Sequence, residues 1–190
     1  MSSRRTITIA GIPGSLRRES FNRRLLEAAA HELAAGVELE IWDGLAGVPP
    51  FNQDAETGPV PLAVAELRTL IAHADAVLIA TPEYNGSMPG QLKNALDWAS
   101  RPPGNAVLEG KPVATVSASP TPYGAAWAQE SLRRVLNVIG ADLAGGELAV
   151  PHAFRQFDQD GRLADAELRG RLAELVAELA DRSYPNAASA

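Results

Sequence analysis

The chain has 190 residues, no cysteine and a formal net charge of −6 at pH 7. The lack of cysteine excludes disulfides, thiolate nucleophiles and iron–sulfur clusters, and the acidic balance argues against sequence-independent binding to nucleic acid. The three histidines, His31, His73 and His152, are scattered and make a poor set of metal ligands, so we expect no metal site and infer that any redox chemistry needs an organic cofactor.

Short apolar segments alternate with longer amphipathic ones along the chain. After the β-branched residues 6–10, a Gly/Pro/Ser bend leads to Ser20 or Asn22, either of which can cap a helix that Gly36 closes. Residues 76–80 are wholly apolar, which places them at the centre of a sheet. The predicted strands are 6–10, 37–41, 76–80, 112–116 and 147–150. The predicted helices are 20–36, 61–73, 91–100, 125–139 and 162–183.

Five strands that alternate with five helices predict an α/β fold, in which a parallel sheet is covered on both faces. Right-handed crossovers favour the flavodoxin-like strand order 2-1-3-4-5, which makes a three-layer sandwich. We expect one domain at 1–184 and a flexible tail at 185–190. The segment 43–61 is too long for a simple connection, so we expect it to border a functional site.

The loop after the first strand has the features of an anion site. Ser15, Ser20 and Asn22 offer donors, and Arg17 offers a charged contact, just where a helix begins. A tight turn, a helix cap and solvated arginines would give the same pattern. The loop matches neither the dinucleotide-binding nor the Walker glycine pattern, so these residues alone leave the identity of the phosphate open.

Two more polar loops, 81–90 and 117–124, follow the third and fourth strands. Ligands of open parallel sheets bind beyond the carboxyl ends of the strands, where the strand order reverses, so we expect all three loops to form one site. In the second loop Tyr84 offers an aromatic face, and Asn85 with the nearby amides can meet a heteroaromatic edge. Taken alone, this loop also fits an ordinary strand-to-helix connection.

The polar loops carry a family resemblance. The chain reads GSLRxxSxN at 14–22, TPEYNxSxPGxLKNAxDWxSRP at 81–102, GKP at 110–112 and SAS at 117–119. Over roughly residues 6–140 it resembles the NADPH-dependent FMN reductase family, which includes bacterial quinone, chromate and azo-dye reductases. The second motif is long and specific.

The resemblance implies a flavodoxin-like fold that holds FMN non-covalently and takes electrons from NADPH or NADH. By this similarity the FMN phosphate is held by Ser15, Arg17, Ser20 and Asn22. The isoalloxazine ring lies along Pro82, Glu83, Tyr84, Asn85 and Ser87, with Ser117 near it.

The family is often dimeric or tetrameric, so the resemblance also implies a homodimer or homotetramer. Asp97, Trp98 and Arg101 would then belong to the helix used in subunit contact. Read from the residues alone, an indole and an arginine at a helix end could equally be packing and a cap.

The third loop departs from the family pattern. Where family members usually carry a glycine-rich turn, this chain has Pro120 and Pro122, which lack amide donors. Tyr123 and Trp127 add bulk. We therefore expect fewer amide contacts to the flavin and a narrower or more aromatic substrate pocket.

The predicted function is an NAD(P)H oxidoreductase that passes hydride to bound FMN and then reduces a quinone, flavin, azo compound or similar small acceptor by a ping-pong mechanism. No side chain is expected to act as a strict acid, base or nucleophile. The alternatives are a flavodoxin-type electron carrier and a non-enzymatic flavin-binding module. No segment approaches the roughly 20 apolar residues of a membrane span, and no signal peptide is evident, so we expect a cytoplasmic protein without membrane or nucleic-acid partners.

Overall fold

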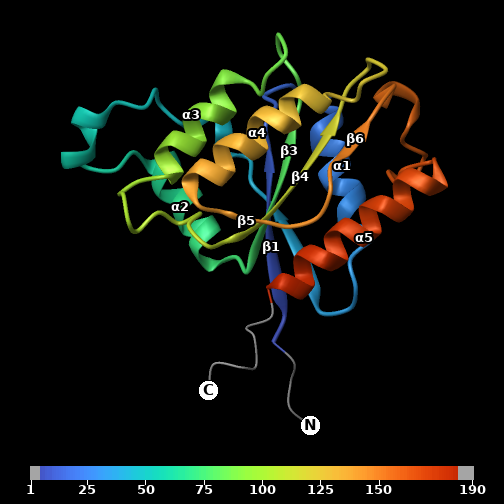
Figure 1. Cartoon of the computed structure of the whole chain (residues 1–190), viewed down its shortest axis with the longest axis horizontal. Coiled ribbons are helices and arrows are strands. Elements are labelled where there is room, and N and C mark those ends of the chain that lie inside the picture. Colours follow the sequence, from blue (N-terminus) through green and yellow to red (C-terminus); the bar gives the residue numbers. More distant parts are fainter. Residues whose placement is uncertain (1–4, 184–190) are drawn as a thin grey trace.

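The computed structural model describes residues 5–183; the predicted tail at 185–190 lies outside them. A parallel sheet runs in the order β2-β1-β3-β4-β5, and β6 also pairs with β4. The predicted strand order is therefore confirmed (Figure 1). The strands are β1 (Ile7–Pro13), β2 (Val37–Ile41), β3 (Ala76–Thr81), β4 (Pro112–Ala118), β5 (Asp142–Leu143) and β6 (Leu148–Val150). The α-helices are α1 (Phe21–Ala30), α2 (Leu62–His73), α3 (Gly90–Ala99), α4 (Ala126–Ile139) and α5 (Ala166–Arg182).

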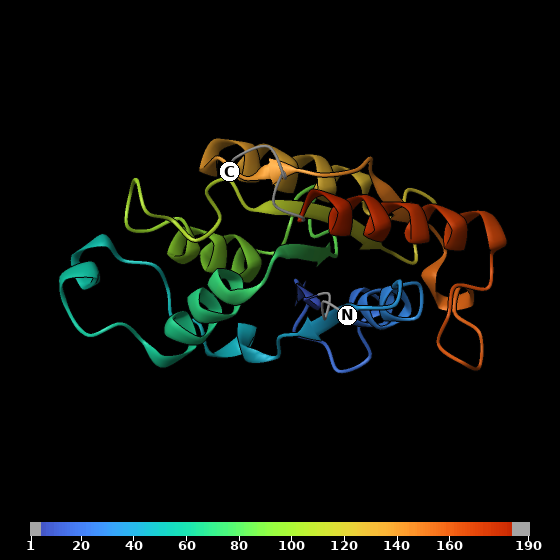
Figure 2. The ribbon, with the colours of Figure 1, turned by 90° about the horizontal axis from the view of Figure 1, so that it is seen from below.

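Helices cover both faces of the sheet, as predicted. One apolar core joins α1 and α5 to alternate residues of β1, β3 and β4, and a second core joins α2, α3 and α4 to the residues between them (Figure 2). β3 is buried along its whole length, so the most apolar strand is central. Within the described residues, no helix is both long and apolar enough to cross a membrane.

Two strands run further than the sequence pattern predicts. β1 continues past Ala10 because Gly11, Ile12 and Pro13 still pair with β3. β4 continues to Ala118 because β6 extends the sheet beside its last residues. Ser117 therefore lies in a strand, and the third loop begins after it.

The predicted fifth strand at 147–150 is β6, and a further short strand, β5, precedes it outside the predicted bounds. β5 pairs with the beginning of β4 and β6 with its end. Gly145 has a φ of +67° between them. Such a backbone bend interrupts the ladder, and glycine adopts it without steric cost.

Two helix boundaries also differ from prediction. α1 ends at Ala30, and Gly36, with a φ of +85°, shapes the turn into β2 instead. α5 begins at Ala166 rather than 162, because the Asp165 carboxylate accepts the N–H groups of the first turn.

The long segment 43–61 contains two short 3₁₀ helices, η1 (Gly44–Gly47) and η2 (Gln53–Thr57). η1 packs beside α2, whereas η2 projects from the body of the fold, at the left of Figure 1. A third, η3 (Ala153–Arg155), follows β6.

Candidate functional site

Three loops leave the carboxyl ends of β1, β3 and β4, toward the top of Figure 1. We call them the first loop (14–20), the second loop (82–89) and the third loop (119–125). The strand order reverses between β1 and β3. The three polar loops thus share the edge where open parallel sheets bind ligands, as predicted.

The first loop is fastened to the end of β3. The Gly14 N–H donates to the Ala80 carbonyl at 2.7 Å. A Cβ at Gly14 would lie 2.7 Å from the Leu92 side chain and 3.1 Å from the same carbonyl oxygen. A side chain at position 14 would therefore press against Leu92 of α3 and the end of β3, so glycine favours this close approach.

Two of the four predicted phosphate contacts are buried and already engaged. Ser20 caps α1, because its Oγ accepts the Arg23 N–H at 3.3 Å. The Asn22 amide donates to the Ala118 carbonyl at 3.0 Å and accepts from the Ala118 N–H at 2.9 Å. These contacts make Asn22 a brace between α1 and β4. Of the two residues that could cap the helix, Ser20 is the cap.

The other two predicted phosphate residues, Ser15 and Arg17, remain accessible. They line a cavity of about 300 Å³. Arg18 and residues just after β2 line the same cavity. Asp43 borders this cavity and pairs with Arg23, whose pKa is raised because the carboxylate accepts its hydrogen bond. The beginning of the segment 43–61 therefore borders the first loop, as expected.

The second loop is a tight antiparallel turn. Tyr84 and Ser87 exchange backbone hydrogen bonds of 2.9 and 3.2 Å. Asn85 and Gly86 between them have φ angles of +53° and +76°, the left-handed pair of a two-residue hairpin turn. Pro82 is half-buried at the base, and the Tyr84 ring is exposed at the tip. The turn places an accessible aromatic ring on a defined backbone.

Glu83, in the second loop, has a carboxylate oxygen that can accept a hydrogen bond from a ligand. Its Oε2 is buried and has no hydrogen-bond partner among the described residues. A buried carboxylate oxygen without a donor costs free energy, so native structures rarely leave one unexplained. A ligand N–H would satisfy it. FMN offers a phosphate for the cationic first loop and a ring N–H for such an acceptor, so the residues fit this group.

The third loop rests on a buried polar network. Ser117 is fully buried; its hydroxyl donates to the Gly124 carbonyl and accepts from Gln129 at 2.8 Å. Gln129 also donates to the Leu148 carbonyl and accepts from the Thr115 hydroxyl. The Ser117 hydroxyl thus fixes the loop from below.

Sequence reasoning gave Gln129 no role. The available signal was its position on the stripe of α4 that continues through Leu132 and Leu136. A glutamine on an apolar stripe needs buried partners, but the pattern could not identify them.

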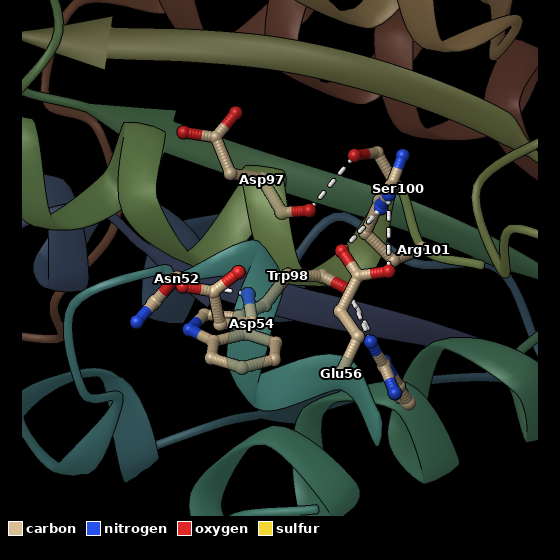
Figure 3. A network of polar contacts seen from close by, with 8 residues as sticks. Asn52, Asp54, Glu56, Asp97, Trp98, Ser100 and Arg101 are labelled. Atoms are coloured by element: carbon tan, nitrogen blue, oxygen red, sulfur yellow. Dashed lines mark hydrogen bonds and ion pairs between the residues drawn. The ribbon is translucent and has the colours of Figure 1, made fainter. Parts of the chain in front are cut away.

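The end of α3 packs against other parts of the same chain. Trp98 is buried, donates from Nε1 to the Pro49 carbonyl at 2.9 Å and meets the Phe51 ring edge-on. Arg101 donates to both carboxylate oxygens of Glu56 at 2.6 and 3.0 Å, which joins η2 to the chain after α3 (Figure 3). Trp98 therefore packs within the chain, as one interpretation predicted, and Arg101 holds the long segment rather than capping the helix.

Comparison with known proteins assigns the chain to a family. The family model for NADPH-dependent FMN reductase matches residues 7–155.

Two curated relatives match over 164 residues, which is 86% of this chain and 88% of each relative. An NAD(P)H-dependent FMN reductase of Pseudomonas aeruginosa is 43% identical. A 2-hydroxy-1,4-benzoquinone reductase of a Burkholderia species is 40% identical.

A solved structure is similar over the whole fold. The flavoenzyme NAD(P)H:(acceptor) oxidoreductase FerB of Paracoccus denitrificans superposes with a TM-score of 0.85 at 34% identity. The match covers 94% of this chain and 97% of that one.

Proposed function

Because the chain belongs to the NADPH-dependent FMN reductase family, we propose that its three loops hold one FMN non-covalently and pass electrons from NAD(P)H to a small acceptor. The observation that carries this assignment is the pairing of a cationic first loop with the buried, unpartnered carboxylate oxygen of Glu83 at one sheet edge. One ligand with a phosphate at one end and a ring N–H at the other satisfies both.

The first loop is the phosphate end of the proposed site. Ser15 and Arg17 are accessible and supply a hydroxyl and a guanidinium, and the free N–H groups at the start of α1 add a favourable dipole. Ser20 and Asn22 complete this end by fixing the helix start and tying it to β4. We assign the latter two side chains a positioning role.

The second loop is the ring end. Its fixed turn presents Tyr84 and Asn85, while Glu83 supplies an acceptor for a ring N–H. Pro82 and Ser87 hold the base of the turn; Ser87 Oγ lies 2.9 Å from Ser131 Oγ on α4. Ser117 acts through the third loop, since its hydroxyl holds the Gly124 carbonyl.

Bound FMN supplies the redox chemistry: it accepts a hydride from a nicotinamide and reduces a quinone, flavin, azo compound or similar acceptor. The protein's task is to hold one ring face open and to exclude competing geometries. We propose that donor and acceptor use that face in turn, which gives ping-pong kinetics. No side chain needs to carry a proton in this scheme.

We further propose that the protein works as a homodimer or homotetramer. The projecting η2 segment leads to Val60 and Leu62, whose side chains are 49% and 75% exposed. Apolar groups beside a projecting segment favour contact with a second copy.

The direct test is NADPH oxidation by the FMN-saturated protein with a quinone present, repeated with NADH. We expect steady NADPH loss that depends on the quinone, with parallel lines in double-reciprocal plots at several quinone concentrations. A flavodoxin-type carrier would bind FMN and oxidise neither nucleotide. That result would reject the reductase assignment for this chain.

A further inference from the structure

Tyr123 and Trp127 form an exposed aromatic pair where the third loop enters α4. Their ring centroids lie 4.9 Å apart with an angle of 42° between the planes. The side chains are 60% and 49% exposed. Folding buries large aromatic groups where it can, so two neighbouring exposed rings point to a ligand or partner.

The backbone holds this pair in a fixed place. Gly124 and Ala125, between the two aromatic residues, have φ angles of +60° and +68°. Ala125 is buried, and a left-handed residue with a Cβ costs roughly 1 kcal/mol. Ser117 holds the Gly124 carbonyl from below. The chain thus accepts strain at the turn that sets where the two rings lie.

Trp127 also lines a cavity that reaches the second loop. Gly86, at the tip of that loop, joins Trp127, Glu130, Ser131 and Arg134 around a space of about 430 Å³. Its walls come from two segments that the hydroxyls of Ser87 and Ser131 hold together at 2.9 Å. Binding pockets for small organic molecules have about 300–1,000 Å³. The aromatic pair therefore adjoins a molecule-sized space next to the proposed ring end of the flavin site.

We propose that Tyr123 and Trp127 form the stacking surface for a planar, conjugated electron acceptor, such as a quinone, and set the acceptor preference of the enzyme. This inference rests on the proposed function, because it places the acceptor beside the flavin-binding edge. Tyr84, two residues before Gly86 in the second loop, is exposed as well. At the rim of the cavity the Arg134 guanidinium offers N–H donors for the oxygens of the acceptor.

The test compares an aromatic with a non-aromatic acceptor on FMN-loaded protein at saturating NADPH. The variants are Tyr123→Leu and Trp127→Leu, with Trp127→Phe as the conservative form. Phe154→Leu is the matched control, because Phe154 is 63% exposed and does not line the cavity. Stacking on an aromatic side chain is worth about three- to tenfold in affinity. We expect the KM for a naphthoquinone to rise by about that factor in both leucine variants.

The same variants should leave the KM for ferricyanide, the FMN content and the KM for NADPH unchanged. Trp127→Phe should recover most of the quinone KM, and Phe154→Leu should match the parent protein. A quinone KM that does not move in active enzyme overturns the inference. So does a parallel rise for ferricyanide, or a change of molar mass in solution, which would make the pair a subunit contact. If the parent protein reduces neither acceptor, the proposed function itself fails.

Discussion

Asn22→Ala removes the amide that continues the sheet beyond the end of β3. Thr81, the last residue of β3, pairs with Ser117, so Ala118 has no partner on that side. Asn22 takes the place of a strand there, with hydrogen bonds of 3.0 and 2.9 Å to the Ala118 carbonyl and N–H. The side chain is 2% exposed. Alanine would leave both backbone groups buried without a partner.

The cost follows from these two groups. Each buried polar group left without a partner costs about 1–3 kcal/mol, so we expect a loss near 3 kcal/mol if water reaches part of the space. A domain of this size loses about 2–4 °C in Tm for each kcal/mol, which predicts a fall of about 6–12 °C.

Thermal unfolding of the FMN-free protein tests this value. The matched control is Ser15→Ala, because the Ser15 hydroxyl accepts one exposed backbone N–H at 3.3 Å. We expect the control to keep its Tm within about 2 °C, since surface changes stay near 0.5 kcal/mol. If Asn22→Ala kept the parent Tm without FMN and lost stability only with FMN bound, the amide would act on the ligand, and the bracing role would be refuted.

Three further predictions concern the first loop, the third loop and an acidic group. Arg17→Ala should raise the FMN dissociation constant tenfold or more in a fluorescence titration, because a charged hydrogen bond contributes about 1.5–3 kcal/mol. The control is Arg182→Ala at the end of α5, away from the first loop, which should change this constant less than about twofold; equal losses would contradict the placement. Gly124→Ala should lower the free energy of unfolding, measured with denaturant, by about 2 kcal/mol more than Gly86→Ala does. Both glycines have a positive φ, but only at Gly124 would a Cβ meet backbone atoms, at 2.8 Å. Equal losses of stability would reject the clash. The pKa of Glu178 is lowered because a backbone N–H after β5 donates to it, with a smaller contribution from a neighbouring arginine. Its small stabilising effect should be present above the ordinary glutamate pKa of about 4.3 and be lost as pH falls through the lower folded value. Thermal melts of Glu178→Gln should therefore fall less steeply at acid pH than those of the parent, and identical slopes would contradict the shift.

The sheet order and the meeting of the three loops could be predicted from the sequence, because both depend on local patterns. The wholly apolar residues 76–80 place β3 at the centre of the sheet. Gly14 and Ser20 indicate a strand-to-helix turn, and this signal does not depend on contacts with distant parts of the chain. Right-handed crossovers then fix which loops share an edge.

Long-range polar contacts could not be predicted in the same way. The role of Asn22 depends on where β3 ends: its last residue, Thr81, pairs with Ser117 and leaves Ala118 of β4 without a strand beside it. No local sequence pattern indicates this. Arg101 and Glu56 pair across 45 positions of the chain. The two-residue strand β5 before the Gly145 bend forms by pairing with the beginning of β4, which its own residues do not indicate. In each case tertiary contact decides between structures that local propensity leaves equal.

The visible absorption spectrum of the purified protein tests the central claim most directly. The account predicts a bound flavin, or one taken up on addition of FMN, whose absorbance NADPH bleaches without oxygen and a quinone restores. A protein that stays colourless after FMN is added, or whose bound flavin neither NADPH nor NADH reduces, would contradict it.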